Sequence, residues 1–91
     1  MNNNNNNWSV YILRCNDDTL YTGITNNIEK RVELHISGKG AKYTRGRGPF
    51  IVEASFPGLT KSEALKLEYK IKQLNKNKKI EYLLSIIGLK D

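Results

Sequence analysis

The alternation of apolar and polar positions predicts two β-strands near the start of the chain. The run from Trp8 to Cys15 repeats with a period of two, which places Tyr11 on the face opposite Val10. A second run, Thr19 to Ile24, alternates in the same way and carries Tyr21. Because the Asn-Asp-Asp sequence between the runs is typical of a turn, the two runs are expected to form a hairpin.

The length of this turn decides whether the two tyrosines meet. If the loop holds an odd number of residues, for example Asn16 to Asp18, odd positions pair with odd positions and Tyr11 lies near Tyr21. A two-residue loop at Asp17-Asp18 would put them on opposite faces. The pattern leaves both registers open, and it also fits tyrosines that only pack in a sheet with their hydroxyls at its rim.

A helix is predicted to follow the hairpin, beginning near Ile28. Its candidate N-cap residues are Thr25, Asn26 and Asn27. Its apolar stripe is formed by Ile28, Val32, His35 and Ile36. His35 is therefore expected at the edge of the buried face. Arg31 precedes His35 by one helical turn, so the two side chains can reach a common ligand. The alternative is a solvated arginine beside a half-buried histidine.

The segment from Ser37 to Pro49 departs from any helix or strand pattern. It contains four glycines, one proline and four basic residues around Tyr43. Glycines let backbone amides approach a ligand closely, and basic side chains neutralise phosphates. The basic residues are Lys39, Lys42, Arg45 and Arg47. The spacing does not match G-x-x-x-x-G-K-[ST], and no strand directly precedes the segment, which argues against a P-loop. A flexible connection is the alternative.

The second half of the chain is predicted to hold one strand and two helices. The strand runs from Phe50 to Phe56 and ends at Pro57-Gly58. Thr60 to Glu63 has the form of a capping box, so a helix is expected to start at Thr60. A last helix is expected from about Lys76 to Ile87, with Gly88 at its end. Its core face is expected to consist of Ile80, Leu83, Leu84 and Ile87. This order indicates an α+β domain with a small three-stranded sheet and three helices.

One carboxylate interrupts the apolar stripe of the middle helix. That stripe consists of Ala64, Leu67, Ile71 and Leu74. Glu68 falls inside it, and a carboxylate on a buried face is costly unless it meets a cation or a metal. The alternatives are an ion pair with Lys72, four residues later, or a side chain that reaches solvent at the margin of the stripe.

Composition narrows the class of protein. The 91 residues suffice for one small domain, expected over residues 8–89, after a disordered Asn-rich leader at residues 1–7. The net charge of +6 favours a polyanionic partner. Cys15 is the only cysteine, which excludes an internal disulfide and a multi-cysteine zinc site. Because no apolar run reaches the ~20 residues of a membrane span and no secretion leader is visible, a cytoplasmic location is expected.

Together these motifs resemble the GIY-YIG nuclease superfamily. Its first motif corresponds to Val10-Tyr11-Ile12 and its second to Tyr21-Thr22-Gly23. With Arg31, Glu68 and the GKGAKYTRGRGP tract, the resemblance runs from Trp8 to about Leu84, and it is greatest to small stand-alone bacterial members.

The chain departs from the superfamily pattern at three places. Val10 stands where the first motif has its glycine, and Ile24-Thr25 stands where some members place a lysine. Several members also use an asparagine after the glutamate, and neither Asn75 nor Asn77 aligns convincingly with it.

The resemblance implies a metal-dependent phosphodiesterase on a three-stranded antiparallel sheet flanked by three helices. Glu68 would be the sole carboxylate on one Mg²⁺ or Mn²⁺, and Arg31 would hold the scissile phosphate. Tyr11 or Tyr21 would orient or deprotonate the attacking water, and His35 would share the proton. The basic residues from Lys39 to Arg47 would contact the nucleic acid.

Two functions of different class follow. The first is an endonuclease that acts on DNA, with RNA as the other candidate nucleic acid. A module of this size has little surface for reading a long sequence, so selectivity for structure is expected, as in repair or recombination. The second is a nucleic-acid-binding module without turnover, or a subunit that is active only with a protein partner.

Overall fold

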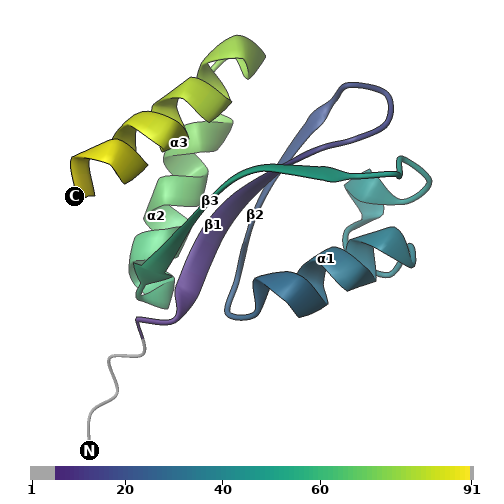
Figure 1. Ribbon diagram of the computed structural model, residues 1–91, viewed down its shortest axis with the longest axis horizontal. Coiled ribbons are helices and arrows are strands. Elements are labelled where there is room, and N and C mark those ends of the chain that lie inside the picture. Colours follow the sequence, from purple (N-terminus) through teal and green to yellow (C-terminus); the bar gives the residue numbers. More distant parts are fainter. Residues whose placement is uncertain (1–5, 91) are drawn as a thin grey trace, which may run out of the picture.

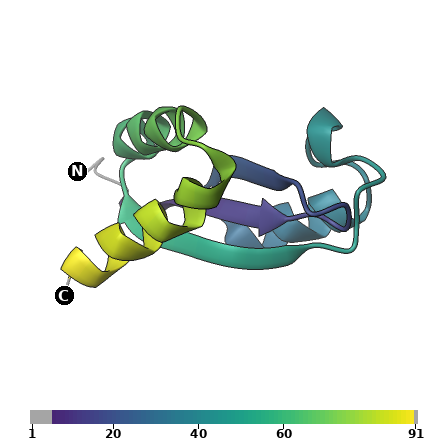
Figure 2. The ribbon, with the colours of Figure 1, turned by 90° about the horizontal axis from the view of Figure 1, so that it is seen from above.

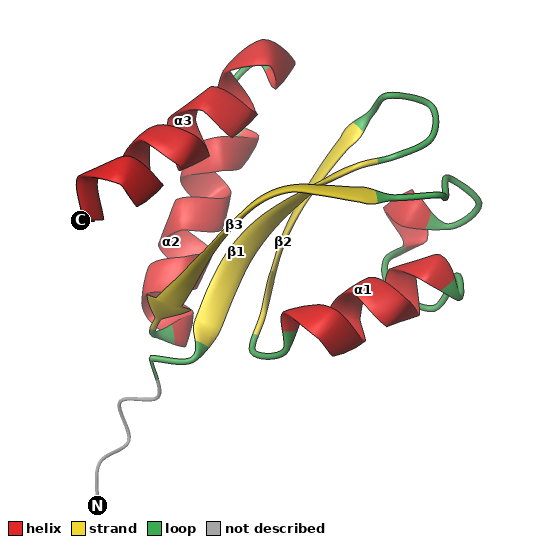
Figure 3. Cartoon of the chain, viewed as in Figure 1, coloured by secondary structure: helices red, strands yellow, loops and turns green. Residues whose placement is uncertain are grey.

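The computed structural model describes residues 6–90 and has the predicted order of elements, β-β-α-β-α-α. Of the expected leader, only residues 6 and 7 lie inside the described range. Figure 3 shows the elements, which are β1 (Trp8–Arg14), β2 (Leu20–Thr25), α1 (Ile28–Ile36), the 3₁₀ turn η1 (Lys42–Thr44), β3 (Ile51–Leu59), α2 (Lys61–Lys72) and α3 (Lys76–Lys90).

The three strands form one antiparallel sheet in the order β2-β1-β3. In the hairpin, Tyr11 pairs with Gly23 and Leu13 pairs with Tyr21, so odd positions face odd positions. The register that brings the two tyrosines to one face is therefore confirmed. The loop is longer than the three residues used as an example, since β1 ends at Arg14 and β2 begins at Leu20.

The helices cover opposite faces of the sheet. Figures 1 and 2 show α2 and α3 together on one face and α1 on the other. Val10 and Ile12, from the even positions of β1, enter the hydrophobic core with residues of α2 and α3. The odd position Tyr11 instead points toward α1, where it contacts His35. The face that carries the tyrosines is therefore separate from the main hydrophobic core.

Both helix starts predicted from capping residues are confirmed. Asn27 is the N-cap of α1, and its side chain accepts a hydrogen bond from the amide of Lys30 at 3.1 Å. Thr60 caps α2 in a complete capping box with Glu63, with reciprocal bonds of 3.1 and 2.9 Å. Each cap satisfies amides that the first helical turn would otherwise leave without a partner.

Two predicted ends were wrong. The third strand does not end at Pro57-Gly58 but continues to Leu59. The pairing of β1 with β3 shifts register between Trp8 and Val10, which marks a bulge in β3, and Gly58 has φ 82°. Because β3 is an edge strand, this bulge can accommodate Pro57. The last helix likewise continues to Lys90, because Gly88 does not adopt the positive φ of a helix-ending glycine.

Two residues assigned to buried helix faces are exposed. Ile36 is 66% exposed, because it is the last residue of α1 and the chain turns away at Ser37. Leu84 is 50% exposed, whereas its neighbour Leu83 is fully buried. The buried stripe of α3 is thus narrower than predicted. Within residues 6–90, no helix is long and apolar enough to span a membrane.

Candidate active site

Tyr11 lies at the centre of the polar contacts on the α1 face. Its side chain is fully buried, and its ring passes over the backbone of Gly23 on β2. A Cβ atom at position 23 would lie 2.6 Å from the Tyr11 hydroxyl and 2.9 Å from the Tyr21 ring. Glycine is therefore required here for close approach, which lets the Tyr11 hydroxyl reach α1.

The hydroxyl of Tyr11 belongs to a chain of hydrogen bonds with one direction. Thr44 donates its hydroxyl proton to the carbonyl of Ala41 at 3.0 Å, so its oxygen must accept from His35 Nδ1 at 2.7 Å. His35 therefore carries its proton on Nδ1. Its Nε2 atom accepts from the Tyr11 hydroxyl at 2.9 Å.

Burial keeps both members of the Tyr11–His35 pair neutral. Burial raises the pKa of Tyr11 to about 12, with Tyr21 and Glu68 acting in the same direction and the Arg31 guanidinium against them. Burial and the Arg31 charge lower the pKa of His35. A proton is therefore held on the Tyr11 oxygen in the absence of an added positive charge.

Arg31 projects from α1 between the two tyrosines. Its Nε donates to the Tyr11 hydroxyl at 3.4 Å, and its terminal nitrogen donates to the carbonyl of Gly40 at 3.4 Å. The bond to Tyr11 raises the pKa of Arg31, and Tyr21 is a second partner that acts in the same direction. Because these bonds are long, the guanidinium can exchange them for stronger bonds to an anion.

Tyr21 is the more accessible of the two tyrosines. Its ring lies 5.1 Å from the His35 ring and 6.2 Å from the Tyr11 ring, measured between centroids, and its side chain is half-buried. We name the group of Tyr11, Tyr21, Arg31 and His35 the Tyr11 cluster. The structure thus brings together two residues of one helical face of α1 and one tyrosine from each strand of the hairpin.

Glu68 lies on α2. Its side chain is 20% exposed and forms an ion pair with Lys72 at 3.2 Å. Lys72 is the alternative partner that the sequence had suggested for this carboxylate. The carboxylate is near enough to contribute to the raised pKa of Tyr11. Within the described residues, no three His, Cys, Asp or Glu side chains group to hold a metal on their own. A single, partly accessible carboxylate fits Mg²⁺, which retains several waters and needs only one or two carboxylates.

The predicted basic loop divides into two parts. Lys39, Lys42 and Arg45 are exposed, whereas Arg47 is half-buried. Arg47 forms an ion pair with Asp17, and its guanidinium lies 4.7 Å above the Tyr43 ring. The backbone of Arg47 also accepts a hydrogen bond from Asn16 at 2.7 Å. The hairpin turn therefore holds the end of the loop in place.

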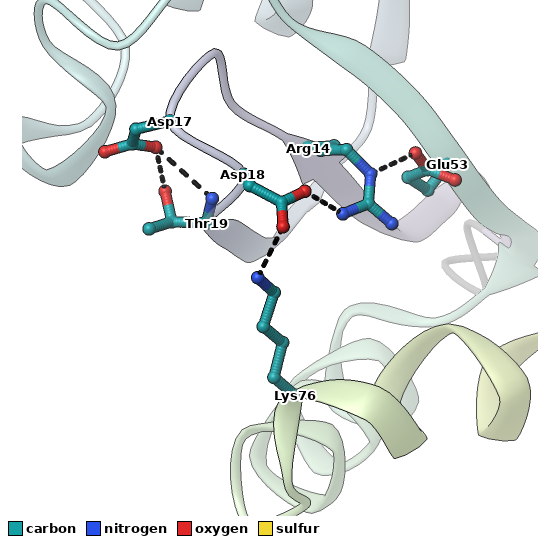
Figure 4. A network of polar contacts seen from close by, with 6 residues as sticks. All are labelled: Arg14, Asp17, Asp18, Thr19, Glu53 and Lys76. Atoms are coloured by element: carbon teal, nitrogen blue, oxygen red, sulfur yellow. Dashed lines mark hydrogen bonds and ion pairs between the residues drawn. The ribbon is translucent and has the colours of Figure 1, made fainter.

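A network of ion pairs anchors the same turn to the other elements (Figure 4). Arg14 contacts Asp18 at 2.5 Å and Glu53 of β3 at 2.6 Å, and Lys76 at the start of α3 contacts Asp18 at 3.1 Å. Hydrogen bonds from Lys76 and Arg14 lower the pKa of Asp18. All of these groups are at least partly exposed, so the network orients the turn more than it stabilises the fold.

Sequence reasoning missed two residues of this site. Thr44 is buried and sets the proton position of His35, and Tyr43 packs 5.9 Å from the Tyr21 ring. Both lie in η1, inside a glycine-rich segment without periodicity. The only available signal was an aromatic residue and a hydroxyl between basic residues, which alone indicates nucleic-acid contact but not contact with His35.

Comparison with known proteins identifies the class. The family model described as the GIY-YIG catalytic domain matches residues 7–81, so the chain belongs to the GIY-YIG family. This domain implies a nuclease-type function, and GIY-YIG nucleases generally use divalent metal ions.

Within this family the chain is similar to small bacterial proteins named UPF0213. A UPF0213 protein from Oceanobacillus iheyensis is 57% identical to this chain, and the matched region covers 81% of this chain and 86% of the relative. The solution structure of UPF0213 protein BH0048 from Bacillus halodurans is 49% identical, with 87% and 83% of the two chains covered and a TM-score of 0.53. The solution structure of protein EF2693 from E. faecalis is 39% identical, with 86% and 83% covered and a TM-score of 0.61.

Proposed function

We propose that this protein is a metal-dependent endonuclease that hydrolyses phosphodiester bonds in DNA and selects its substrate by structure. The observation that carries the proposal is the convergence of Arg31, His35 and two tyrosines, with Glu68 close enough for its charge to act on Tyr11. Hydrolysis of a phosphodiester needs charge neutralisation at the phosphate, an oriented water and a route for its proton. The cluster contains a group for each of these needs.

In this proposal Arg31 holds the scissile phosphate. Its long bonds to Tyr11 and Gly40 are exchanged for bonds to two phosphate oxygens, which a guanidinium can make in parallel. Its permanent charge also compensates the negative charge that develops during attack.

The two tyrosines have different tasks. Tyr21 is half-buried and can contact the attacking water, whereas Tyr11 is fully buried and acts on its neighbours. Nε2 of His35 faces the Tyr11 hydroxyl and can accept its proton. Because the pKa of Tyr11 is about 12, this transfer requires an additional positive charge close to the phenol.

Glu68 would hold a single Mg²⁺ or Mn²⁺. When bound, such an ion supplies positive charge to the phosphate and lowers the pKa of coordinated water. Glu68 must exchange its contact with Lys72 for the ion, and the released ammonium remains close to the substrate. The exposed loop residues Lys39, Lys42 and Arg45 would contact the sugar-phosphate backbone without reading its sequence.

The second candidate is a nucleic-acid-binding module without turnover. Two observations favour it. The Glu68 carboxylate already forms an ion pair with the Lys72 ammonium, and the Tyr11 side chain is fully buried. Such a module would use the basic loop and Arg31 but would have no need of Glu68.

Cleavage assays with a Glu68→Ala variant separate the two candidates. End-labelled duplex, single-stranded, flap and four-way-junction DNA, and one RNA, are incubated with Mg²⁺, Mn²⁺ or EDTA. We expect the wild-type protein to cleave the structured DNA in a metal-dependent reaction. In Glu68→Ala the rate of cleavage should be at least ~100-fold lower, because the loss of one charge-stabilising group in an active site typically has an effect of this size. Glu33→Ala removes an exposed carboxylate from α1 and serves as the matched control.

Binding of the same substrates is measured alongside cleavage. An endonuclease retains binding in the Glu68→Ala variant while losing turnover. Absence of cleavage by the wild-type protein, together with equal binding by the variant, would overturn the catalytic proposal for this chain.

A further inference from the structure

We propose that a hollow beside the Tyr11 cluster holds the base of an unpaired nucleotide next to the scissile phosphate. The hollow is lined by Leu20, Tyr21, Thr22, Tyr43, Lys72 and Lys79, and we name it the Tyr43 hollow. This inference deepens the proposed function and rests on its nucleic-acid part. It names the feature that would make cleavage selective for structure.

The walls of the hollow offer aromatic surface to a base. The rings of Tyr21 and Tyr43 lie 5.9 Å apart with an angle of 30° between their planes, and Tyr43 is 46% exposed. Every nucleobase can stack on such a ring, irrespective of sequence. The volume of about 280 Å³ lies just below the ~300–1,000 Å³ of sites for drug-sized ligands, which suits a single base.

The rim of the hollow offers positive charge to a phosphate. Lys72 and Lys79 approach it from the end of α2 and from α3. Lys79 is held there by a bond of 3.0 Å from its Nζ to the carbonyl of Ile71. Burial and the charge of Lys72 lower the pKa of Lys79, so the two ammonium groups lie close enough for their charges to interact.

Tyr43 is held in place before any ligand binds. The Arg47 guanidinium lies 4.7 Å above its ring, and Arg47 is fixed in turn by Asp17 and by the backbone of Asn16. An exposed aromatic ring loses little further conformational entropy on stacking when it is already ordered. This arrangement is typical of a recognition surface rather than of a connecting loop.

The position of the hollow explains how a base would affect cleavage. Tyr21 belongs both to the hollow and to the Tyr11 cluster, and Lys72 both lines the hollow and pairs with Glu68. A base stacked there would place its own phosphate beside Arg31. A base inside a duplex is already stacked and paired, and its extrusion loses both interactions, so unpaired nucleotides are favoured.

Binding in EDTA tests this inference without requiring turnover. The probe is a flap DNA with 2-aminopurine placed, in separate samples, at each position around the junction; a fully paired duplex of equal length is the reference. We expect quenching of 2-aminopurine at one or two unpaired positions by the wild-type protein. Tyr43→Ala should abolish this quenching and weaken flap binding on the order of tenfold, while duplex binding changes less than twofold.

Two control variants isolate the aromatic contact. Tyr43→Phe retains the ring and should behave as the wild type. Tyr69→Ala removes a tyrosine that is 69% exposed on α2 and does not line the hollow, and it should have no effect. The inference is overturned if Tyr43→Ala leaves quenching unchanged or weakens flap and duplex binding equally.

The outcome is distinguishable from that of the proposed function. Cleavage by the wild-type protein without quenching at any position would overturn this inference and leave the endonuclease proposal intact. Quenching that depends on Tyr43, without cleavage under any condition, would support this inference in a binding module and contradict the endonuclease.

Discussion

At the scale of single residues, the direction of the hydrogen bonds determines what Tyr11 can do. The sequence of donors runs from Arg31 through Tyr11 and His35 to Thr44 and the carbonyl of Ala41. The buried His35 therefore presents an acceptor to Tyr11 and cannot also donate to it while neutral. The proton on the phenol has a defined acceptor, and the residue that defines it is Thr44.

The first prediction concerns this role of Thr44. Thr44→Val removes the acceptor for His35 Nδ1, so the neutral ring should shift its proton to Nε2 and lose its function as an acceptor for Tyr11. Cleavage should fall about 10- to 100-fold, as for other residues that orient an active group through a hydrogen bond. Because His35 is the only histidine, ¹⁵N NMR of the imidazole reports the tautomer directly.

Two results decide whether Thr44 acts through His35. Thr44→Ser retains the hydroxyl and should restore both the wild-type tautomer and the activity. If the imidazole spectrum of Thr44→Val is that of the wild type, the directional chain is wrong, whatever the activity of the variant.

The second prediction compares the same substitution at two glycines. Gly23→Ala would place a Cβ atom 2.6 Å from the hydroxyl of Tyr11, which is fully buried and cannot move aside. We expect a loss of about 1–3 kcal/mol in the free energy of unfolding, together with loss of cleavage. At Gly88, in α3, a Cβ atom meets nothing within 4 Å, so Gly88→Ala should be neutral or stabilising by up to ~1 kcal/mol. Urea denaturation of both variants provides the measurement, and equal effects would contradict the steric argument.

At the scale of the elements, the predictions that succeeded depended on local signals. The starts of α1 and α2 could be predicted because Asn27 and Thr60 satisfy the amides of their own helices. The end of β3 could not, because a bulge opposite Ser9 accommodates Pro57 and Gly58, and a bulge depends on the neighbouring strand. The exposure of Leu84 likewise depends on how little of α3 meets the rest of the molecule.

The candidate site was predictable only in part for the same reason. Pattern and resemblance together single out Tyr11, Tyr21, Arg31, His35 and Glu68. The contacts of Thr44 and Tyr43 arise when η1 folds back onto α1 and β2, and no periodicity records such a contact. The ion pair between Glu68 and Lys72 confirms the structural alternative for Glu68, and its role as a metal ligand stays a prediction.

The third prediction concerns that ion pair on α2. In Lys72→Met the Glu68 carboxylate no longer has to exchange an ammonium group for a metal ion. We expect Mn²⁺ affinity in the absence of DNA to rise about two- to fivefold, the range of a partly exposed ion pair, while affinity for flap DNA falls. Mn²⁺ binding is measured by electron paramagnetic resonance, so the result does not depend on turnover. Lys66→Met, exposed on the same helix, is the control; unchanged Mn²⁺ affinity in Lys72→Met would count against Glu68 as the ligand.

At the scale of the whole molecule, the distribution of positive charge indicates how DNA would be oriented. The net charge of +6 is carried largely by the loop after α1 and by the lysines of α2 and α3. These two basic segments meet at the Tyr43 hollow, which Tyr43 of η1 lines together with Lys72 and Lys79. A nucleic-acid backbone bound beside Tyr21 would therefore meet positive charge from both segments.

The fourth prediction tests this orientation through the salt dependence of binding. Each phosphate contact adds about −0.9 to the slope of log K against log salt for duplex DNA, so Lys42→Gln and Arg45→Gln should each reduce the slope by about one. Lys61→Gln changes the net charge by the same amount and is the control. Lys61 begins α2 beside Trp8, and the start of α2 is far from η1 (Figures 1 and 2). The slope of this variant should therefore remain that of the wild type. Fluorescence anisotropy from 50 to 300 mM salt measures all three slopes. If they change by the same amount, binding follows net charge alone, and the loop has no particular position on the DNA.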